Sequence, residues 1–128
     1  MTPVTLIPVG VPATIHAEEV TLMQEAELNI RTFTKEELVE LTKEIANEYG
    51  VSPEVMIAVV QCESQFNPDA YNASENSRGL VQVHEASHPQ ITDEQAYDPY
   101  FALHFLGENL ANGNGKMWTC FRQIEKAG

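Results

Sequence analysis

The feature that most constrains the fold of this chain is an apolar helical run that ends in a carboxylate. Ser52 and Pro53 have the form of a helix start, with Ser52 as the N-cap and proline at the first helical position. Residues Val55 to Val60 are all apolar, so we expect a helix that is almost wholly buried and that runs to about Glu63. The segment Phe66-Asn67-Pro68 then turns the chain away from this helix.

Glu63 has, at this place, the properties of a general acid. The negative end of a helix dipole disfavours a charged carboxylate in the last turn, and burial favours the protonated form at neutral pH. In isolation, however, a glutamate after an apolar helix is more often a surface residue. The surrounding sequence is therefore needed to distinguish a general acid from a surface residue.

Other helix start and stop residues predict further helices. Thr34 and Glu37 form a capping box before an amphipathic helix that Gly50 ends. Asp98-Pro99 repeats the N-cap and proline pattern at the start of another helix, and a last helix is expected over about residues 116–126. Together with the central run, these signals predict a small domain that is mainly α.

The remaining segments carry weaker signals. Turn formers fill residues 66–79, which predicts turns with a small hairpin, and residues 80–83 predict a short strand or a turn. Prolines interrupt residues 1–17 and no Lys or Arg precedes Arg31, so neither a continuous helix nor a clear signal peptide is expected there. Apolar residues alternate from Val20 to Ile30, which favours an extended edge segment with a helix as a close alternative. We therefore expect an extended or flexible arm over residues 1–32.

The strongly negative charge argues against nucleic acid as a partner. The formal net charge is −12 and the chain has only seven Lys and Arg, whereas binding to nucleic-acid phosphates needs many basic side chains. No apolar stretch is long enough to span a membrane. The sequence contains no signal for an oligomeric state or for a particular location.

Three blocks of sequence together resemble a known family. They are Glu63-Ser64-x-Phe66-Asn67-Pro68-x-Ala70, then Gly79-Leu80-x-Gln82, and then Asp98-Pro99 before an amphipathic helix. In this order and spacing they resemble the lytic transglycosylases of the soluble-lytic (SLT), goose-type-lysozyme-like family, over about residues 36–123. The resemblance implies a small lysozyme-like helical domain at residues 33–125, with a minor β-hairpin element near the active site. It implies an enzyme without metal or organic cofactor that cleaves the MurNAc–GlcNAc β-1,4 bond of peptidoglycan glycan strands and leaves a 1,6-anhydro-MurNAc end.

The resemblance also assigns roles to single residues. Glu63 takes the place of the one catalytic acid, which protonates the glycosidic oxygen and then accepts the proton of the C6 hydroxyl. Ser64 completes the Glu-Ser pair, Gln82 matches the glutamine that lines the sugar cleft, and Ser77 takes a small-residue place at the turn near the cleft. These residues are therefore the expected catalytic and substrate-binding groups.

The last helix departs from the family pattern. The family usually has an Ala-Tyr-Asn-Ala-Gly segment there, whose tyrosine faces the catalytic acid. The corresponding segment here is Met117-Trp118-Thr119-Cys120-Phe121-Arg122. Trp118, Phe121 or Tyr97 are the alternative sources of an aromatic ring at this place. As the only tryptophan, Trp118 either stacks on a sugar or, more often in a small core, packs internally.

The two cysteines, Cys62 and Cys120, are either free apolar core residues or one disulfide. In the family the last helix packs beside the helix that carries the acid, and this implies that Cys62 pairs with Cys120. A bridge across a loop of about 58 residues would contribute roughly 4 kcal/mol in the chain-entropy model.

The segment from His84 to His88 spells H-E-x-x-H, the signature of a zinc protease. That site needs both imidazoles on one face of a continuous helix, whereas Pro89 follows directly and a β-like segment precedes. We therefore expect no metal and place His84 and His88 at the rim of the sugar cleft. Arg78 either meets a carboxylate of the substrate or, more often, pairs with a surface acid.

Two rival functions stay open at this point. A hydrolytic muramidase would need a second carboxylate to position water, and Glu75 or Asp69 could supply it. A glycan-binding or structural module of a phage or secretion assembly would need no turnover, and the missing tyrosine segment keeps that alternative open.

Overall fold

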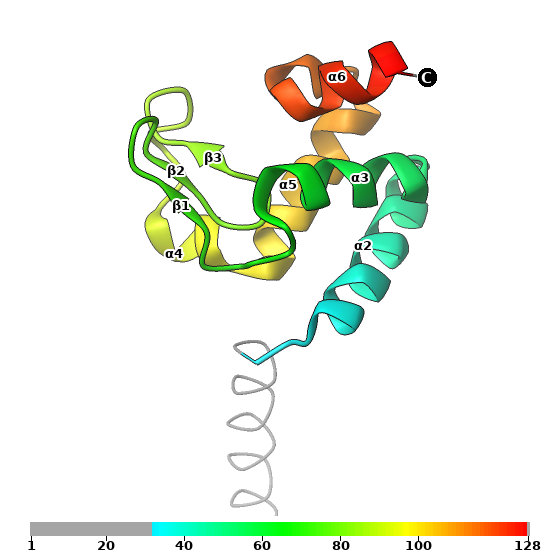
Figure 1. Ribbon diagram of the computed structural model, residues 1–128, viewed down its shortest axis with the longest axis horizontal. Coiled ribbons are helices and arrows are strands. Elements are labelled where there is room, and N and C mark those ends of the chain that lie inside the picture. The colour runs from blue at the N-terminus through cyan, green and yellow to red at the C-terminus, as the bar shows by residue number, and fades with distance from the viewer. Residues whose placement is uncertain (1–31, 128) are drawn as a thin grey trace, which may run out of the picture. The chain divides into compact units, whose positions relative to one another are not determined.

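The computed structural model describes residues 32–127, and a compact unit begins at Thr34. Its elements, in chain order, are α2 (Lys35–Tyr49), α3 (Pro53–Ser64), β1 (Tyr71–Asn72), β2 (Ser77–Arg78), β3 (Val83–His84), α4 (Asp93–Tyr97), α5 (Pro99–Ala111), the 3-10 helix η1 (Gly115–Met117) and α6 (Thr119–Ala127) (Figure 1). The prediction of a mainly helical domain with a minor β element is confirmed. The arm at residues 1–32, with its extended or helical segment at Val20 to Ile30, falls almost entirely outside the described residues and stays a prediction.

Local sequence sets where the helices begin. The Thr34 hydroxyl accepts a hydrogen bond from the Glu37 backbone (3.1 Å), and the Glu37 carboxylate accepts one from the Thr34 backbone (2.9 Å). Ser52 and Asp98 cap α3 and α5 in front of a proline, as predicted. Gly50 ends α2 with a φ of +70°. Four helix boundaries, at Thr34, Gly50, Ser52 and Asp98, thus follow from capping chemistry alone.

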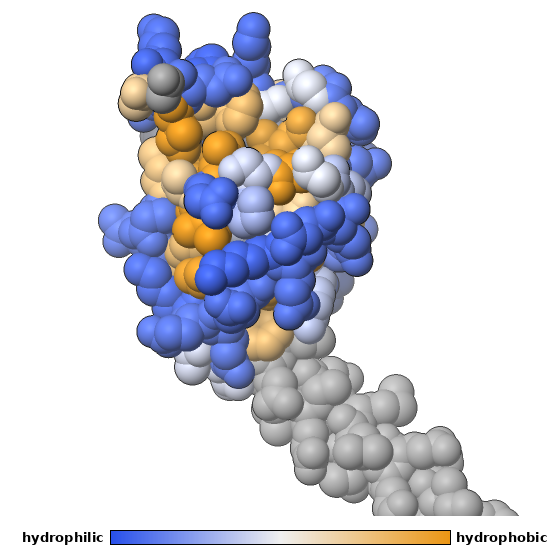
Figure 2. Space-filling view, turned by 90° about the vertical axis from the view of Figure 1, so that its right-hand side faces the viewer, coloured by the Kyte–Doolittle hydropathy of each residue, from blue (hydrophilic) through white to orange (hydrophobic). Residues whose placement is uncertain are grey.

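The core lies where α2 packs against α3 and α5. The larger apolar side chains buried there are Leu38, Ile45, Met56, Val59, Val60, Leu103 and Leu106. The opposite face of α2 is exposed and charged, and Figure 2, which faces that side of the molecule, shows hydrophilic side chains across it. No helix within residues 32–127 is long and apolar enough to cross a membrane.

Three expectations about helices need correction. In α3, Val55, Ile57 and Ala58 are only half-buried, because a domain this small has too few helices to cover α3 on every side. The short helix α4 was not predicted, although Thr92 and Gln95 form a second capping box. The last helix is not continuous: Trp118 has extended backbone (φ −102°, ψ 123°) and separates η1 from α6.

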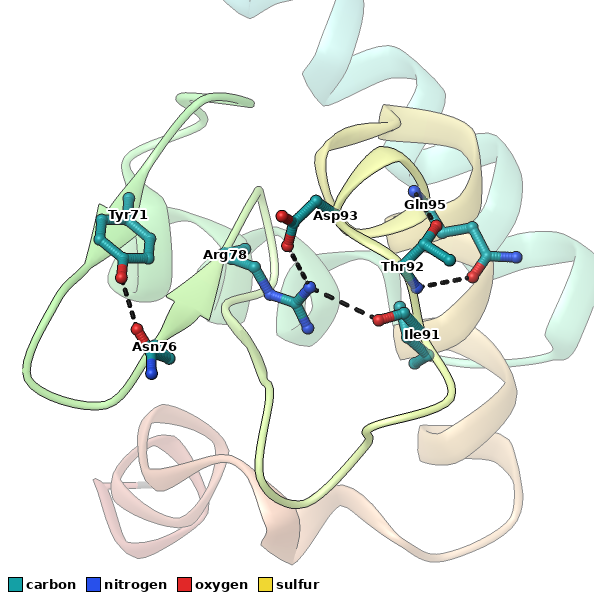
Figure 3. Close-up of polar contacts among 7 residues, drawn as sticks. All are labelled: Tyr71, Asn76, Arg78, Ile91, Thr92, Asp93 and Gln95. Carbon is teal, nitrogen blue, oxygen red and sulfur yellow. Dashed lines mark hydrogen bonds and ion pairs between the residues drawn. The ribbon is translucent and has the colours of Figure 1, made fainter.

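The predicted hairpin is part of a three-stranded antiparallel sheet in the order β1-β2-β3. In the central strand, Ser77 pairs with Asn72 and His84 on its two sides. The sheet is joined to α4 by Arg78, whose buried guanidinium donates to Asp93 (2.6 Å) and to the Ile91 carbonyl (3.5 Å) (Figure 3).

Arg78 thereby resolves the alternatives drawn from the sequence. Its side chain is about 4% exposed and pairs with an acid, Asp93, whose own side chain is exposed. A guanidinium buried in this way holds two elements together and does not line the cleft described below. The more common expectation, pairing with a surface acid, is the one that the contacts support.

Candidate active site

A cleft of about 840 Å³ lies between the end of α3, the sheet, α5 and the η1–α6 segment. Its lining residues come from separate parts of the chain: Glu63, Asn72, Glu75, Ser77, Gln82, Val83, His84, Ser87, His88, Phe105, Met117, Trp118, Thr119 and Cys120. Glu63, Ser77, Gln82 and His84 are thus brought together at one cavity.

The backbone after Glu63 turns sharply and delivers this side chain to the cleft. α3 ends at Ser64, and both Gln65 (φ 54°) and Phe66 (φ 60°) adopt the left-handed conformation that costs non-glycine residues about 1–3 kcal/mol each. Burial of the Phe66 ring, which is 4% exposed, offsets part of this cost. Asn67 then accepts a hydrogen bond from the Asp69 backbone (3.0 Å) and completes the turn toward β1. Strain of this kind is common at functional sites.

Ser64 has a structural position. Its buried hydroxyl donates to the Val60 carbonyl one turn earlier (3.2 Å). Ser64 does not line the cleft. Ser64 therefore stabilises the end of α3 and is not placed to contact a substrate in the cleft.

The environment of Glu63 favours its protonated form. Burial raises the pKa of this carboxyl above its ordinary value, and the negative charge of Glu75 raises it further. A hydrogen bond from the Cys120 backbone stabilises the charged form and opposes the increase. The protonated form of Glu63 is thus more favoured than in an ordinary glutamate, and the Cys120 backbone N–H is available to stabilise the carboxylate form.

The sheet supplies the wall that faces Glu63. Gln82, itself in a left-handed conformation (φ 53°), donates its amide N–H groups to the carbonyls of Gly79 (2.9 Å) and Ala70 (3.3 Å). Ser77 donates to the Glu75 carboxylate (3.5 Å). Gln82 therefore both lines the cleft and stabilises the turn before β3 through these hydrogen bonds. Asp69, the other candidate for a second carboxylate, does not line the cleft.

Both histidines lie on the cleft lining. His84 pairs with the Ser87 hydroxyl (2.8 Å), and the His88 ring packs edge-on against Phe105, with 5.1 Å between ring centroids. Burial lowers the pKa of His88, and the nearby His84 lowers it further. Within residues 32–127 no group of three potential metal ligands is present.

Trp118 is the aromatic ring that the last segment brings to the cleft. Its ring is 5% exposed, its indole N–H donates to the Val81 carbonyl (2.7 Å), and it meets Phe105 edge-on. The tryptophan is therefore mainly a packing residue with one edge on the cleft. Phe121 lies against Gly115, and Tyr97 ends α4; neither lines the cleft.

Several lining residues were not foreseen from the sequence, namely Asn72, Ser87, Phe105, Met117 and Thr119. They come from β1, a turn, α5, η1 and the start of α6, and no local pattern links them. Cys62 and Cys120 form a disulfide with their Cα atoms 6.0 Å apart, directly beside Glu63.

In a comparison with protein-family models, residues 40–122 match the transglycosylase SLT domain. Curated proteins and solved structures give no significant match to the chain.

Proposed function

The chain belongs to the SLT transglycosylase family, and we propose that it is a peptidoglycan lytic transglycosylase in which Glu63 acts first as general acid and then as general base. The bond cleaved is the MurNAc–GlcNAc β-1,4 bond, and the product carries a 1,6-anhydro-MurNAc end. The observation that most supports the proposal is the half-buried Glu63 on the wall of the cleft, with a pKa raised by burial. A carboxyl group in this state keeps a proton for donation above its ordinary titration range.

The proposed reaction uses one carboxyl group twice, first to donate a proton and then to accept a different one. Glu63 donates its proton to the glycosidic oxygen while the bond between this oxygen and C1 of MurNAc breaks. The Glu63 carboxylate then accepts the proton of the C6 hydroxyl as its oxygen bonds to C1, so Glu63 ends as the acid and no water is consumed. The N–H of Cys120 supports the second half of the cycle, because it stabilises the carboxylate between the two steps.

The composition of the cleft suits an uncharged sugar chain. Its polar lining consists largely of neutral donors and acceptors, Asn72, Ser77, Gln82, Ser87 and Thr119. No Lys or Arg is among the lining residues, all of which lie in the described part of the chain. Recognition would therefore depend on hydrogen bonds and shape rather than on attraction to the carboxylates of the peptide stems.

The product identifies the reaction. We expect the purified protein to release soluble muropeptides from peptidoglycan whose MurNAc ends are lighter by one water than hydrolysed ends, as measured by mass spectrometry. Reducing, hydrated ends would instead show a muramidase on the same site. An absence of soluble products, with retained binding to peptidoglycan, would favour the non-catalytic glycan-binding module.

Glu75 gives the hydrolytic alternative a specific basis. It lines the same cleft, and its charge acts on Glu63. A hydrolytic enzyme uses a second carboxylate to activate water or to attack the sugar. In a transglycosylase the C6 hydroxyl replaces the water, so Glu75 would act only through the charge that it adds.

The pH dependence of wild type and Glu75→Gln separates these two roles. Activity should fall as pH rises through the raised pKa of Glu63, because the acid form is lost. In Glu75→Gln the neighbouring charge is gone, so the Glu63 pKa falls and this basic limb moves to lower pH, while the products stay anhydro. A loss of about 10²-fold or more across the whole pH range would indicate a direct role for Glu75 instead. The Glu85→Gln variant is the matched control, since Glu85 is exposed and does not line the cleft.

A further inference from the structure

The wall of the cleft formed by the start of α6 has few attachments to the rest of the domain. α6 packs mainly against α3 and η1, and Cys120 is the one buried residue of this nine-residue helix, all of which is described. Phe121 and Ile124 are half-buried, and the remaining residues of α6 are exposed. So little apolar burial would leave a helix of this length marginal by itself.

The disulfide joins this weakly held wall to the catalytic segment. Cys62 is the residue before Glu63, and Cys120 is the residue whose backbone hydrogen-bonds to Glu63. Thr119 and Cys120 also line the cleft. One covalent bond therefore connects the end of α3 to the start of α6, the two segments whose relative position sets the contact between the Cys120 backbone and Glu63.

We propose that the Cys62–Cys120 disulfide is a positioning element of the active site, which holds the Cys120 backbone N–H and the start of α6 against Glu63. Reduction of the bond then lowers the rate of glycan cleavage without unfolding the α2–α3–α5 core. This inference rests on the proposed function, because glycan cleavage is its readout.

The bond is accessible to a chemical reductant in the folded protein. Cys62 is exposed, so a dithiol can attack without prior unfolding. The dithiol transfers two electrons and two protons to the bond, and it leaves as a cyclic disulfide while thiols form at Cys62 and Cys120. Trp118 stays anchored by its hydrogen bond to Val81, so the displacement starts at Thr119.

Release of α6 has a definite effect on the titration of Glu63. The titratable groups that share the cleft with it are Glu75, His84 and His88, and the η1–α6 wall adds none to the described lining. Burial is the largest cause of the raised Glu63 pKa, and the Cys120 hydrogen bond is a smaller, opposing one. Opening the wall therefore lowers the pKa of Glu63 toward its ordinary value, and the basic limb of activity moves to lower pH.

The test compares the oxidised and the dithiothreitol-reduced protein in the release of soluble muropeptides across pH. We expect a loss of about 10- to 100-fold on reduction, a basic limb at lower pH, and recovery of both on reoxidation. Circular dichroism at the assay temperature should show the helices of the core retained. The double variant Cys62→Ser/Cys120→Ser should have the low activity and not respond to dithiothreitol, which controls for effects of the reductant on the assay.

Three outcomes would contradict the inference. Equal rates and equal pH profiles in the two redox states would exclude a positioning role. Global unfolding on reduction would make the bond purely structural. An inactive oxidised protein would instead refute the proposed function, and the inference with it. If the double variant does not fold, the cycle of reduction and reoxidation on the natural chain still decides among these outcomes.

Discussion

Glu63→Gln should abolish glycan cleavage almost completely while the fold is retained. Glutamine keeps the size of the side chain and can still accept hydrogen bonds, but it has no proton to donate to the glycosidic oxygen. General acid–base catalysis by a positioned side chain contributes about 10²- to 10⁴-fold. We therefore expect at least a 10²-fold lower rate of muropeptide release, measured with purified peptidoglycan at the pH optimum of the wild type.

The matched control is the same substitution on the same helix. Glu54 lies in the first turn of α3, is exposed and does not line the cleft, so Glu54→Gln should keep its activity within about twofold. A Glu63→Gln variant that cleaves at more than a tenth of the wild-type rate would remove Glu63 from the mechanism.

Stability should change in the opposite direction to activity. The folded-state pKa of Glu63 is raised above its unfolded value, so the folded protein binds more protons, and stability falls as pH rises through the window between the two values. At pH values above that window the wild type retains this penalty. Glu63→Gln removes the partly desolvated charge, so its melting temperature at neutral pH should equal or exceed that of the wild type. An active-site acid that costs stability is a known form of trade-off.

The sequence predicted well where local chemistry decides. The Thr34 and Ser52 caps, the Asp98-Pro99 start and the hairpin in residues 66–79 each depend on side chains within a few positions of one another. Apolar periodicity predicted burial less well, because an all-apolar run such as Val55 to Val60 does not indicate which face of the helix stays partly exposed to solvent. α4 was not predicted because a helix of five residues is too short to show helical apolar periodicity, although the capping box at Thr92 marks its start.

The lining of the cleft could not be predicted in the same way. The resemblance placed Glu63 and Gln82, but Phe105 and Met117 reach the cleft only through packing of distant elements. Arg78 illustrates the same limit, since its burial against Asp93 depends on the contact between the sheet and α4. Tertiary contacts of this kind leave no periodic trace in a single sequence.

Gly79 shows what the Gly-Leu-x-Gln block means physically. Its backbone has a φ of +82°, its N–H donates to the Ala70 carbonyl (2.8 Å), and its carbonyl accepts from the side chain of Gln82 (2.9 Å). A Cβ built at Gly79 would lie 2.0 Å from the Ala96 carbonyl oxygen, at the C-terminal part of α4. The residue thus allows the wall of the cleft and α4 to approach more closely than any side chain would permit.

Gly79→Ala should accordingly destabilise the protein more than any other glycine-to-alanine change at positive φ in residues 32–127. The left-handed conformation costs a residue with a Cβ about 1–2 kcal/mol, and the forced separation from rigid backbone adds roughly 1–3 kcal/mol. We expect a total decrease of about 2–5 kcal/mol in the free energy of unfolding, measured by urea denaturation. The displaced turn should also lower activity, since the backbone carbonyl that accepts from the Gln82 side chain would move with it.

Gly113→Ala separates the two contributions. Gly113 has nearly the same φ, +80°, but no atom lies within 4 Å of its ideal Cβ. Only the conformational cost should remain there, about 1–2 kcal/mol, and cleavage should be unaffected because Gly113 does not line the cleft. If both variants lose the same stability, the contact with Ala96 has no energetic weight, and the glycine is needed for its φ alone. If Gly79→Ala loses more stability and Gly113→Ala keeps full activity, close packing of the sheet on α4 is what fixes the wall opposite Glu63.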